Sequence, residues 1–110
     1  MTVATINEHT HVLARLGHAL SEPTRAGILL ILRRGDAYPS DLAEQLAVSK
    51  QVMSNQLRCL KGCGLVDAVP EGRRTRYRLK QPELAGALDA LLALSLVVEP
   101  GCCSGAECTC

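Results

Sequence analysis

The chain has 110 residues, six cysteines and only two aromatic side chains, both tyrosines. A chain of this length forms one domain with a core of moderate size, which a partner subunit can stabilise further. The shortage of aromatic side chains argues against a reader of single-stranded nucleic acid, because such proteins stack bases on aromatic rings.

The net charge of +1 conceals an uneven distribution along the chain. Residues 1–49 carry a net charge of −1. Residues 50–80 carry eight basic and two acidic side chains, and residues 81–110 carry four acidic and no basic ones. Such a concentration of positive charge indicates a localised anion-binding face.

The N-terminal residues have neither the basic head nor the apolar run of a secretory signal, and no apolar stretch is long enough to cross a bilayer. We therefore expect a cytoplasmic protein with no membrane contact. Six cysteines in a reducing compartment indicate metal binding or redox chemistry rather than structural disulfides.

Helical spacing of apolar residues predicts four helices in the first part of the chain. They span His9–Leu20, Pro23 to about Arg33, Ser40–Leu46 and Ser49 to about Lys61. Ser21 or Glu22 is expected to cap the second helix, Ser40 the third and Ser49 the fourth. In the third helix, Ala43 and Leu46 are expected to face inward.

Two strands and a fifth helix are predicted to follow. The strands are Leu65–Val69 and Thr75–Leu79, joined by a turn over Pro70–Arg74. The fifth helix runs from Pro82 to about Val98 and is apolar on nearly every side. One face can pack on its own domain, and a second copy of the chain usually covers the other. We therefore expect a homodimer whose interface is formed by the first and fifth helices.

This order of elements predicts a winged helix-turn-helix, a mainly α fold with a β-hairpin wing. Residues 1–100 would form the DNA-binding and dimerisation domain, and residues 101–110 a flexible, cysteine-rich, metal-binding tail. We expect no enzyme activity, because the sequence shows neither a nucleophile paired with a base nor a phosphate-binding loop.

The fourth helix has the pattern of a DNA-recognition helix. One stripe, expected to face the core, holds Met53, Leu57, Leu60 and Gly64. The opposite side carries side chains that hydrogen-bond base edges, and the hairpin adds arginines suited to phosphate or minor-groove contacts. The residues expected to contact double-stranded operator DNA are Ser49, Lys50, Gln51, Ser54, Asn55, Arg58, Arg73, Arg74 and Arg76.

Cys59 and Cys63 lie four residues apart on this helix, which places their Cβ atoms roughly 6 Å apart on one face. They fall on its flank, away from both the core stripe and the DNA-reading side. Two thiolates rarely hold a metal tightly alone, and metal binding could order the tail around them. The tail offers Cys102, Cys103, Cys108 and Cys110 as further ligands. All-thiolate ligation favours soft or borderline ions such as Cd²⁺, Pb²⁺, Zn²⁺, Hg²⁺, Cu⁺ or trivalent arsenic.

Three segments, residues 16–25, 42–46 and 76–79, resemble the ArsR/SmtB metalloregulatory repressors, and the resemblance covers roughly residues 12–98. The motif LRCLKGCGLV, which begins at Leu57 and places both cysteines in the recognition helix, resembles the CmtR-type cadmium and lead sensors of that family. The resemblance implies a repressor that binds its operator as an apo dimer and releases it when a soft metal binds.

The resemblance also implies a ligand set. Cys59 and Cys63 of one protomer would share the ion with a tail thiolate of the other, and Cys102 or Cys103 matches that position most closely. With four cysteines in the tail, the third ligand stays open and a four-sulfur site is also open. The sequence departs from other members, since Gly35–Ser40 lacks a cysteine pair, the last helix lacks the Asp/His set of zinc sensors, and Gln56 stands where many members have His.

Three alternatives stay open at this point. An arsenite-responsive repressor could bind arsenic through the C-terminal cysteines alone. A thiol sensor could form a disulfide or persulfide under oxidant. A metal-buffering protein could carry the basic face without reading DNA.

Overall fold

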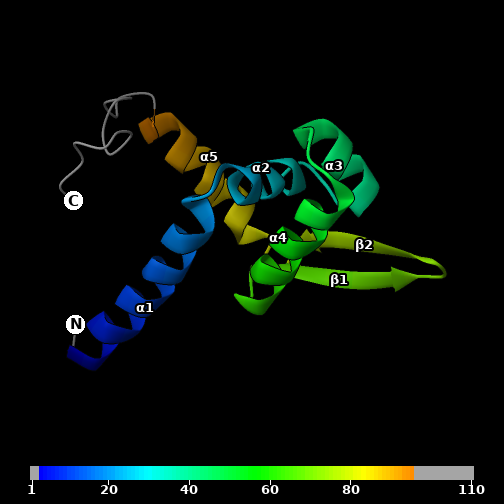
Figure 1. Cartoon of the computed structure of the whole chain (residues 1–110). Coiled ribbons are helices and arrows are strands. Elements are labelled where there is room, and N and C mark those ends of the chain that lie inside the picture. Colours follow the sequence, from blue (N-terminus) through cyan, green and yellow to red (C-terminus); the bar gives the residue numbers. More distant parts are fainter. Residues whose placement is uncertain (1–2, 96–110) are drawn as a thin grey trace.

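The computed structural model describes residues 3–95, which form five helices and a two-stranded sheet (Figure 1). In chain order these are α1 (Val3–Leu20), α2 (Pro23–Leu32), α3 (Pro39–Leu46), α4 (Lys50–Gly62), β1 (Val66–Glu71), β2 (Arg74–Leu79) and α5 (Glu83–Ser95). Helices α3 and α4 form a helix-turn-helix, and the hairpin that follows is its wing. The predicted winged helix-turn-helix is confirmed.

The wing lies at the opposite end of the molecule from helices α1 and α5 (Figure 1). Figure 1 shows α1 projecting from the body and joining it only at the Leu20 end, with α5 on the same side. The hairpin of β1 and β2 extends away from them, beyond α3 and α4. The DNA-reading elements therefore leave α1 and α5 accessible to a second copy.

The core is built from one apolar stripe of each helix and the base of the hairpin. Its buried residues are Ala19, Ile28, Leu29, Leu32, Leu42, Ala43, Met53, Leu57, Leu60, Val66, Leu79 and Leu88. In α3 both Ala43 and Leu46 face inward as predicted, Ala43 buried and Leu46 partly buried against the core. Leu42, which was not predicted, is the fully buried side chain of this helix.

The stripe of α4 is confirmed at three of its four positions. Met53, Leu57 and Leu60 are all 2% exposed or less. Gly64 does not face the core as predicted, because α4 ends at Gly62 and Gly64 is exposed in the following turn. Its φ of +79° lies in the left-handed region, which glycine adopts without steric cost.

Side-chain caps fix the starts of two helices. The Glu22 carboxylate accepts a hydrogen bond from the Arg25 backbone N–H at 2.9 Å, and this bond lowers the pKa of Glu22. Pro23 occupies the first turn of the same helix, where its missing N–H leaves no bond unmade. Ser49 caps α4, since its hydroxyl accepts from the Val52 N–H at 3.1 Å. Both caps were predicted, with Ser21 as the alternative to Glu22.

Two helix starts differ from the prediction. Helix α3 begins at Pro39, and its N-cap residue is Tyr38 rather than Ser40, because proline favours the first helical position. The Tyr38 side chain makes no capping hydrogen bond. Helix α1 begins at Val3 instead of His9, because residues 3–8 contain no glycine or proline to stop it. The predicted extension of the last helix from Leu96 to Val98 lies outside the described residues.

The antiparallel hairpin runs in register from Val66 opposite Leu79 to Glu71 opposite Arg74. Its strands reach further toward the turn than predicted, so the connection narrows to Gly72 and Arg73. Gly72 has a φ of +61°, which a tight hairpin turn requires. Pro70 fits within β1 because β1 is an edge strand of a two-stranded sheet.

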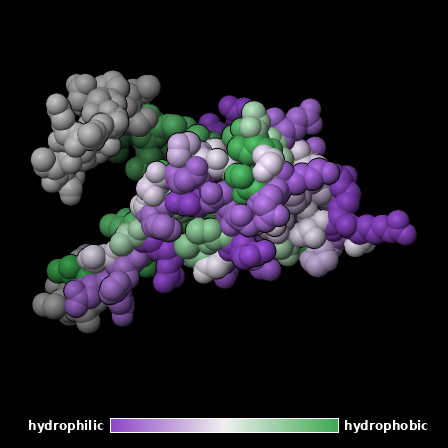
Figure 2. Space-filling model, viewed as in Figure 1, coloured by the Kyte–Doolittle hydropathy of each residue, from purple (hydrophilic) through white to green (hydrophobic). Residues whose placement is uncertain are grey.

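Apolar side chains stand exposed on α1 and α5 (Figure 2). They are Ile6, Val12, Leu13, Leu91, Leu92 and Leu94. Val12, Leu13 and Leu94 are each more than 60% exposed, which a monomer in water would disfavour. This surface matches the predicted dimer interface. None of the helices within residues 3–95 is both long and apolar enough to cross a membrane.

Leu60→Ala is expected to lower the free energy of unfolding by about 2–5 kcal/mol, because it removes a fully buried side chain from α4. Val52→Ala, on the partly exposed side of the same helix, should change it by less than about 0.5 kcal/mol. Urea unfolding at one fixed protein concentration measures both. Equal losses in the two variants would contradict the assignment of the core stripe.

Candidate DNA interface and metal centre

The exposed face of α4 presents the side chains predicted to read DNA. Those exposed are Lys50, Gln51, Ser54, Asn55 and Arg58, and Ser49 stands exposed at the N-cap. The Gln51 side-chain amide donates from Nε2 to Asn55 Oδ1 at 3.1 Å, so these two side chains lie together one turn apart. Amides and guanidinium groups in this position can hydrogen-bond base edges in a major groove.

Arg73 and Arg74 form the basic tip of the wing, and both are exposed. The Arg74 guanidinium stacks over the Tyr38 ring with its carbon 3.5 Å from the ring centroid, a cation–π contact. This contact ties the tip to the start of α3. A positively charged tip that projects beyond α3 and α4 suits contact with a phosphate backbone.

Arg76, the third predicted wing contact, lies in an ion-pair network. Its Nε donates to Glu71 Oε1 at 3.0 Å, and its Nη1 pairs with the Asp36 carboxylate. Tyr38 donates its hydroxyl proton to the same Glu71 oxygen at 2.9 Å. The Tyr38 hydrogen bond, with the Arg76 bond second, lowers the pKa of Glu71, and the bond to Glu71 raises the pKa of both Tyr38 and Arg76.

This network anchors the wing to the loop between α2 and α3. The same loop pairs with β2 through Ala37, whose N–H donates to the Tyr77 carbonyl at 3.0 Å and whose carbonyl accepts from the Tyr77 N–H at 2.8 Å. Because the folded-state pKa of Glu71 is lowered, its contribution to stability is present at neutral pH and is lost as the pH falls through that pKa. The two carboxylates offset the charge of Arg76, so its predicted contact with DNA stays a prediction.

Cys59 and Cys63 are half-buried free thiols on the flank of α4. Cys59 lies in the last full turn, and Cys63 is the C-cap residue. The Cys63 N–H donates to the Cys59 carbonyl at 3.0 Å, which continues the helical pattern and keeps the two side chains one turn apart. Two thiols on a half-buried flank form a donor set that fits a soft metal ion.

Residues 3–95 of one protomer do not complete this metal centre. The described part of the chain brings together no group of three or more His, Cys, Asp or Glu side chains that could hold a metal. Cys102, Cys103, Cys108 and Cys110 lie outside the described residues. A metal ion held by Cys59 and Cys63 would therefore need ligands from outside this described part of the chain.

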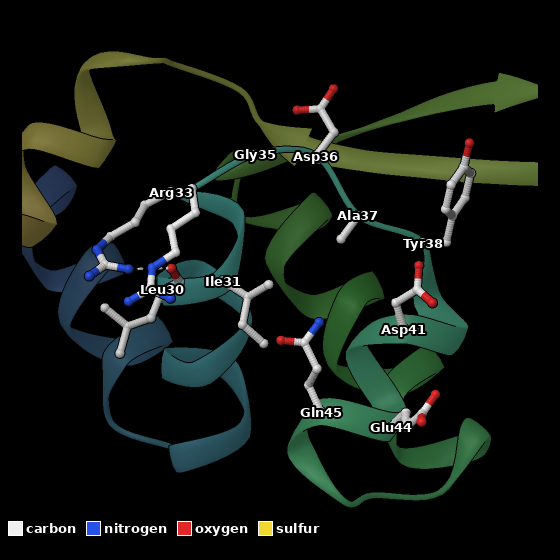
Figure 3. A pocket seen from close by; sticks show the side chains of 11 residues that line it. Leu30, Ile31, Arg33, Gly35, Asp36, Ala37, Tyr38, Asp41, Glu44 and Gln45 are labelled. Carbon is white, nitrogen blue, oxygen red and sulfur yellow. Dashed lines mark hydrogen bonds between the residues drawn. The ribbon is translucent and has the colours of Figure 1, made fainter.

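An open hollow of about 830 Å³ lies between α2 and α3 (Figure 3). Figure 3 shows Leu30 and Ile31 on one side and Asp41, Glu44 and Gln45 on the other. The residues that line it include no cysteine or histidine. It is therefore separate from both the DNA-reading face and the thiols.

Arg25 ends the first segment that resembles the ArsR/SmtB repressors, but the sequence analysis assigned it no role. In the structure it links three helices. Its guanidinium donates from Nη2 to the His18 carbonyl at 2.9 Å, from Nε to the Ala19 carbonyl at 3.3 Å, and from Nη1 to Gln56 Oε1 at 3.0 Å. One sequence signal exists, because a basic side chain in the first turn of a helix opposes the helix dipole unless it bonds elsewhere.

A family model described as the bacterial regulatory protein, arsR family, matches residues 22–68. The HTH-type transcriptional regulator CmtR of Mycobacterium tuberculosis is 49% identical over 87 residues, which cover 79% of this chain and 74% of that protein. The chain belongs to the ArsR family. It is a DNA-binding transcriptional regulator and not an enzyme, as predicted.

Solved structures agree with this membership. The solution structure of the cadmium metal-sensor CmtR from M. tuberculosis matches with a TM-score of 0.67 and 47% identity, over 86% of this chain and 98% of that one. A homodimeric winged helix-turn-helix DNA-binding domain from Mycobacterium bovis matches with a TM-score of 0.75 and 26% identity, over 86% and 87% of the two chains.

Glu71→Ala is expected to lower the pKa of Tyr38 toward the ordinary value of about 10, because it removes the carboxylate that accepts the hydrogen bond of the Tyr38 hydroxyl. The ring signals of Tyr38, followed by NMR through an alkaline titration, measure the change. Tyr77 in the same spectra is the internal reference. An unchanged Tyr38 titration would contradict the wing network.

Proposed function

We propose that this ArsR-family chain is a metal-responsive repressor that binds its operator as an apo homodimer and leaves it when cysteine thiolates bind Cd²⁺ or Pb²⁺. The observation that carries this proposal is the position of Cys59 and Cys63, two half-buried free thiols on the recognition helix itself. A ligand held at these thiols acts directly on the element that reads DNA.

The DNA-bound state follows from the shape of the domain. Two α4 helices of a dimer would enter successive major grooves of a palindromic operator, with half-sites about 34–36 Å apart. The DNA contacts are assigned to Ser49, Lys50, Gln51, Ser54, Asn55, Arg58, Arg73, Arg74 and Arg76. The exposed apolar side chains of α1 and α5 support association with a second copy of the chain.

The metal centre is assigned to Cys59 and Cys63 together with thiolates of the tail. Residues 1–100 would be the DNA-binding and dimerisation domain, and residues 101–110 the metal-binding tail. Cys102 or Cys103 of the partner supplies the third sulfur, and Cys108 or Cys110 can supply a fourth. Zn²⁺ and trivalent arsenic also suit such a site. A cytoplasmic location would keep these thiols reduced.

Release of DNA requires that metal binding and operator binding each weaken the other. A hundredfold preference of the metal for the DNA-free dimer weakens operator binding by the same factor, about 2.7 kcal/mol of coupling. The structure offers a direct origin for this coupling, because a pull on the Cys59 turn moves the helix that carries Asn55 and Arg58. The 47% sequence identity to the cadmium metal-sensor CmtR supports Cd²⁺ as the effector.

Cys59→Ser is expected to bind operator DNA as tightly as the native protein and to stay bound when Cd²⁺ or Pb²⁺ is added, because one of the two helix ligands is lost. Fluorescence anisotropy on the protein's own promoter DNA measures binding and release. Arg58→Met is the matched control on the same helix. Arg58→Met should lower the affinity for operator DNA by about tenfold or more and leave Cd²⁺ binding unchanged.

Normal release of Cys59→Ser by metal would contradict the assigned centre. Release by arsenite alone, dependent only on the tail cysteines, would favour an arsenic sensor. Release by peroxide in metal-free buffer would favour a thiol switch. Absence of sequence-specific DNA binding would favour a metal-buffering protein.

A further inference from the structure

Arg25 sits where α1, α2 and α4 meet. It is the third residue of α2, and the Glu22 carboxylate holds its backbone N–H at 2.9 Å. Its guanidinium, half-buried, donates to two carbonyls in the last turn of α1 and to the side chain of Gln56 on α4. The Arg25 side chain thus joins its own helix, α2, to both α1 and α4.

The partners of this guanidinium are three neutral oxygens. A cation favours the C-terminal end of a helix, where the carbonyl groups carry partial negative charge, so Arg25 stabilises the last turn of α1. Gln56 is the single partner of Arg25 on α4 among the hydrogen bonds of the described residues. We call this arrangement of Arg25, the His18 and Ala19 carbonyls and Gln56 the Arg25 clamp.

The direction of α1 depends on this corner. Figure 1 shows that α1 projects from the body and joins it only near Leu20. Because α1 carries part of the exposed apolar surface, its direction decides how far apart two α4 helices lie in a dimer. A contact that fixes α1 relative to α4 therefore helps to fix the spacing at which the dimer reads DNA.

Gln56 also lies close to the thiols. Residues 56, 59 and 63 follow an i, i+3, i+7 spacing, which places Gln56, Cys59 and Cys63 along one stripe of α4. This stripe is the flank between the buried residues and the DNA-reading face. A small rotation of α4 imposed at Cys59 would act on the Gln56 side chain one turn away.

We propose that Arg25 is a positioning residue that holds α4 in its operator-binding orientation against α1, and that this orientation is released at the Arg25–Gln56 bond when the Cys59 turn moves. The second half of this inference rests on the proposed metal response. The first half concerns the apo protein and can be tested without metal.

The test compares Arg25→Met, Gln56→Met and the double variant with the native protein. Each single variant should weaken apo operator binding by about tenfold, as expected for loss of a hydrogen bond to a charged group. The double variant should lose no more than the weaker-binding single variant, because both substitutions break the same Arg25–Gln56 bond. Fluorescence anisotropy at several salt concentrations provides the affinities.

Two further readouts separate positioning from direct contact with DNA. The salt dependence of Arg25→Met should match the native slope, whereas loss of a phosphate contact would reduce the slope by about one. Cd²⁺ binding, followed by thiolate-to-metal absorption, should be retained in all variants. The fold-change in operator affinity on adding Cd²⁺ should be smaller than in the native protein, because the bond that transmits it is already absent.

Arg33→Met is the matched control. Arg33 is the C-cap residue of α2. Its side chain pairs with Asp89 of α5 at 2.8 Å and makes no hydrogen bond to α4 within the described residues. The Asp89 side chain is 64% exposed and that of Arg33 17%, so water screens the carboxylate end of this pair. Its loss should change operator affinity by less than about threefold. If Arg25→Met fails to fold, Arg25→Lys, which keeps the charge but not the planar three-way donor, takes its place.

Native affinity of Gln56→Met, additive losses in the double variant, or a reduced salt slope of Arg25→Met would each overturn the positioning role. If the native protein binds operator DNA but does not release it with Cd²⁺, the proposed function is wrong. The operator affinities of the apo variants would then still test whether Arg25 positions α4. An unchanged Cd²⁺ response in Gln56→Met, beside a responsive native protein, would overturn only the transmission through Gln56.

Discussion

Burial of Met53, Leu57 and Leu60 fixes the rotation of α4 about its own axis, and every functional feature of the domain depends on that rotation. With this stripe against the core, Gln51, Asn55 and Arg58 must face outward. The cysteines then fall between the two faces, half-buried. One apolar stripe thus divides a helix of thirteen residues into a packing face, a reading face and a flank where a ligand can act.

The position of the wing depends more on polar contacts than on packing. Its strands contribute the buried Val66 and Leu79 and the partly buried Tyr77 to the core, so packing alone holds little of the hairpin in place. The bonds that join Glu71 to Tyr38 and Arg76, with the Ala37 bridge to Tyr77, fix it to the loop before α3. These polar contacts use the charge of Arg76 for position and leave Arg73 and Arg74 exposed for an anionic partner.

Local features were predictable because they follow from short-range chemistry. The order of elements, the α4 stripe and the caps at Glu22 and Ser49 are all visible in residue spacing and type. The Arg25–Gln56 bond joins residues 31 positions apart, and periodicity within one helix carries no information about such a pair. The start of α1 was missed for a different reason, since residues 3–8 are too few to show a helical period of apolar residues.

The central claim is that Cys59 and Cys63 supply two sulfur ligands to an ion that the tail thiolates complete. X-ray absorption of the Cd²⁺-loaded protein counts the sulfur ligands directly. Our account predicts about three or four sulfurs in the native protein and a loss of about two in the variant with both Cys59→Ser and Cys63→Ser. A sulfur count that is unchanged in this double variant would place the metal wholly in the tail and contradict the account.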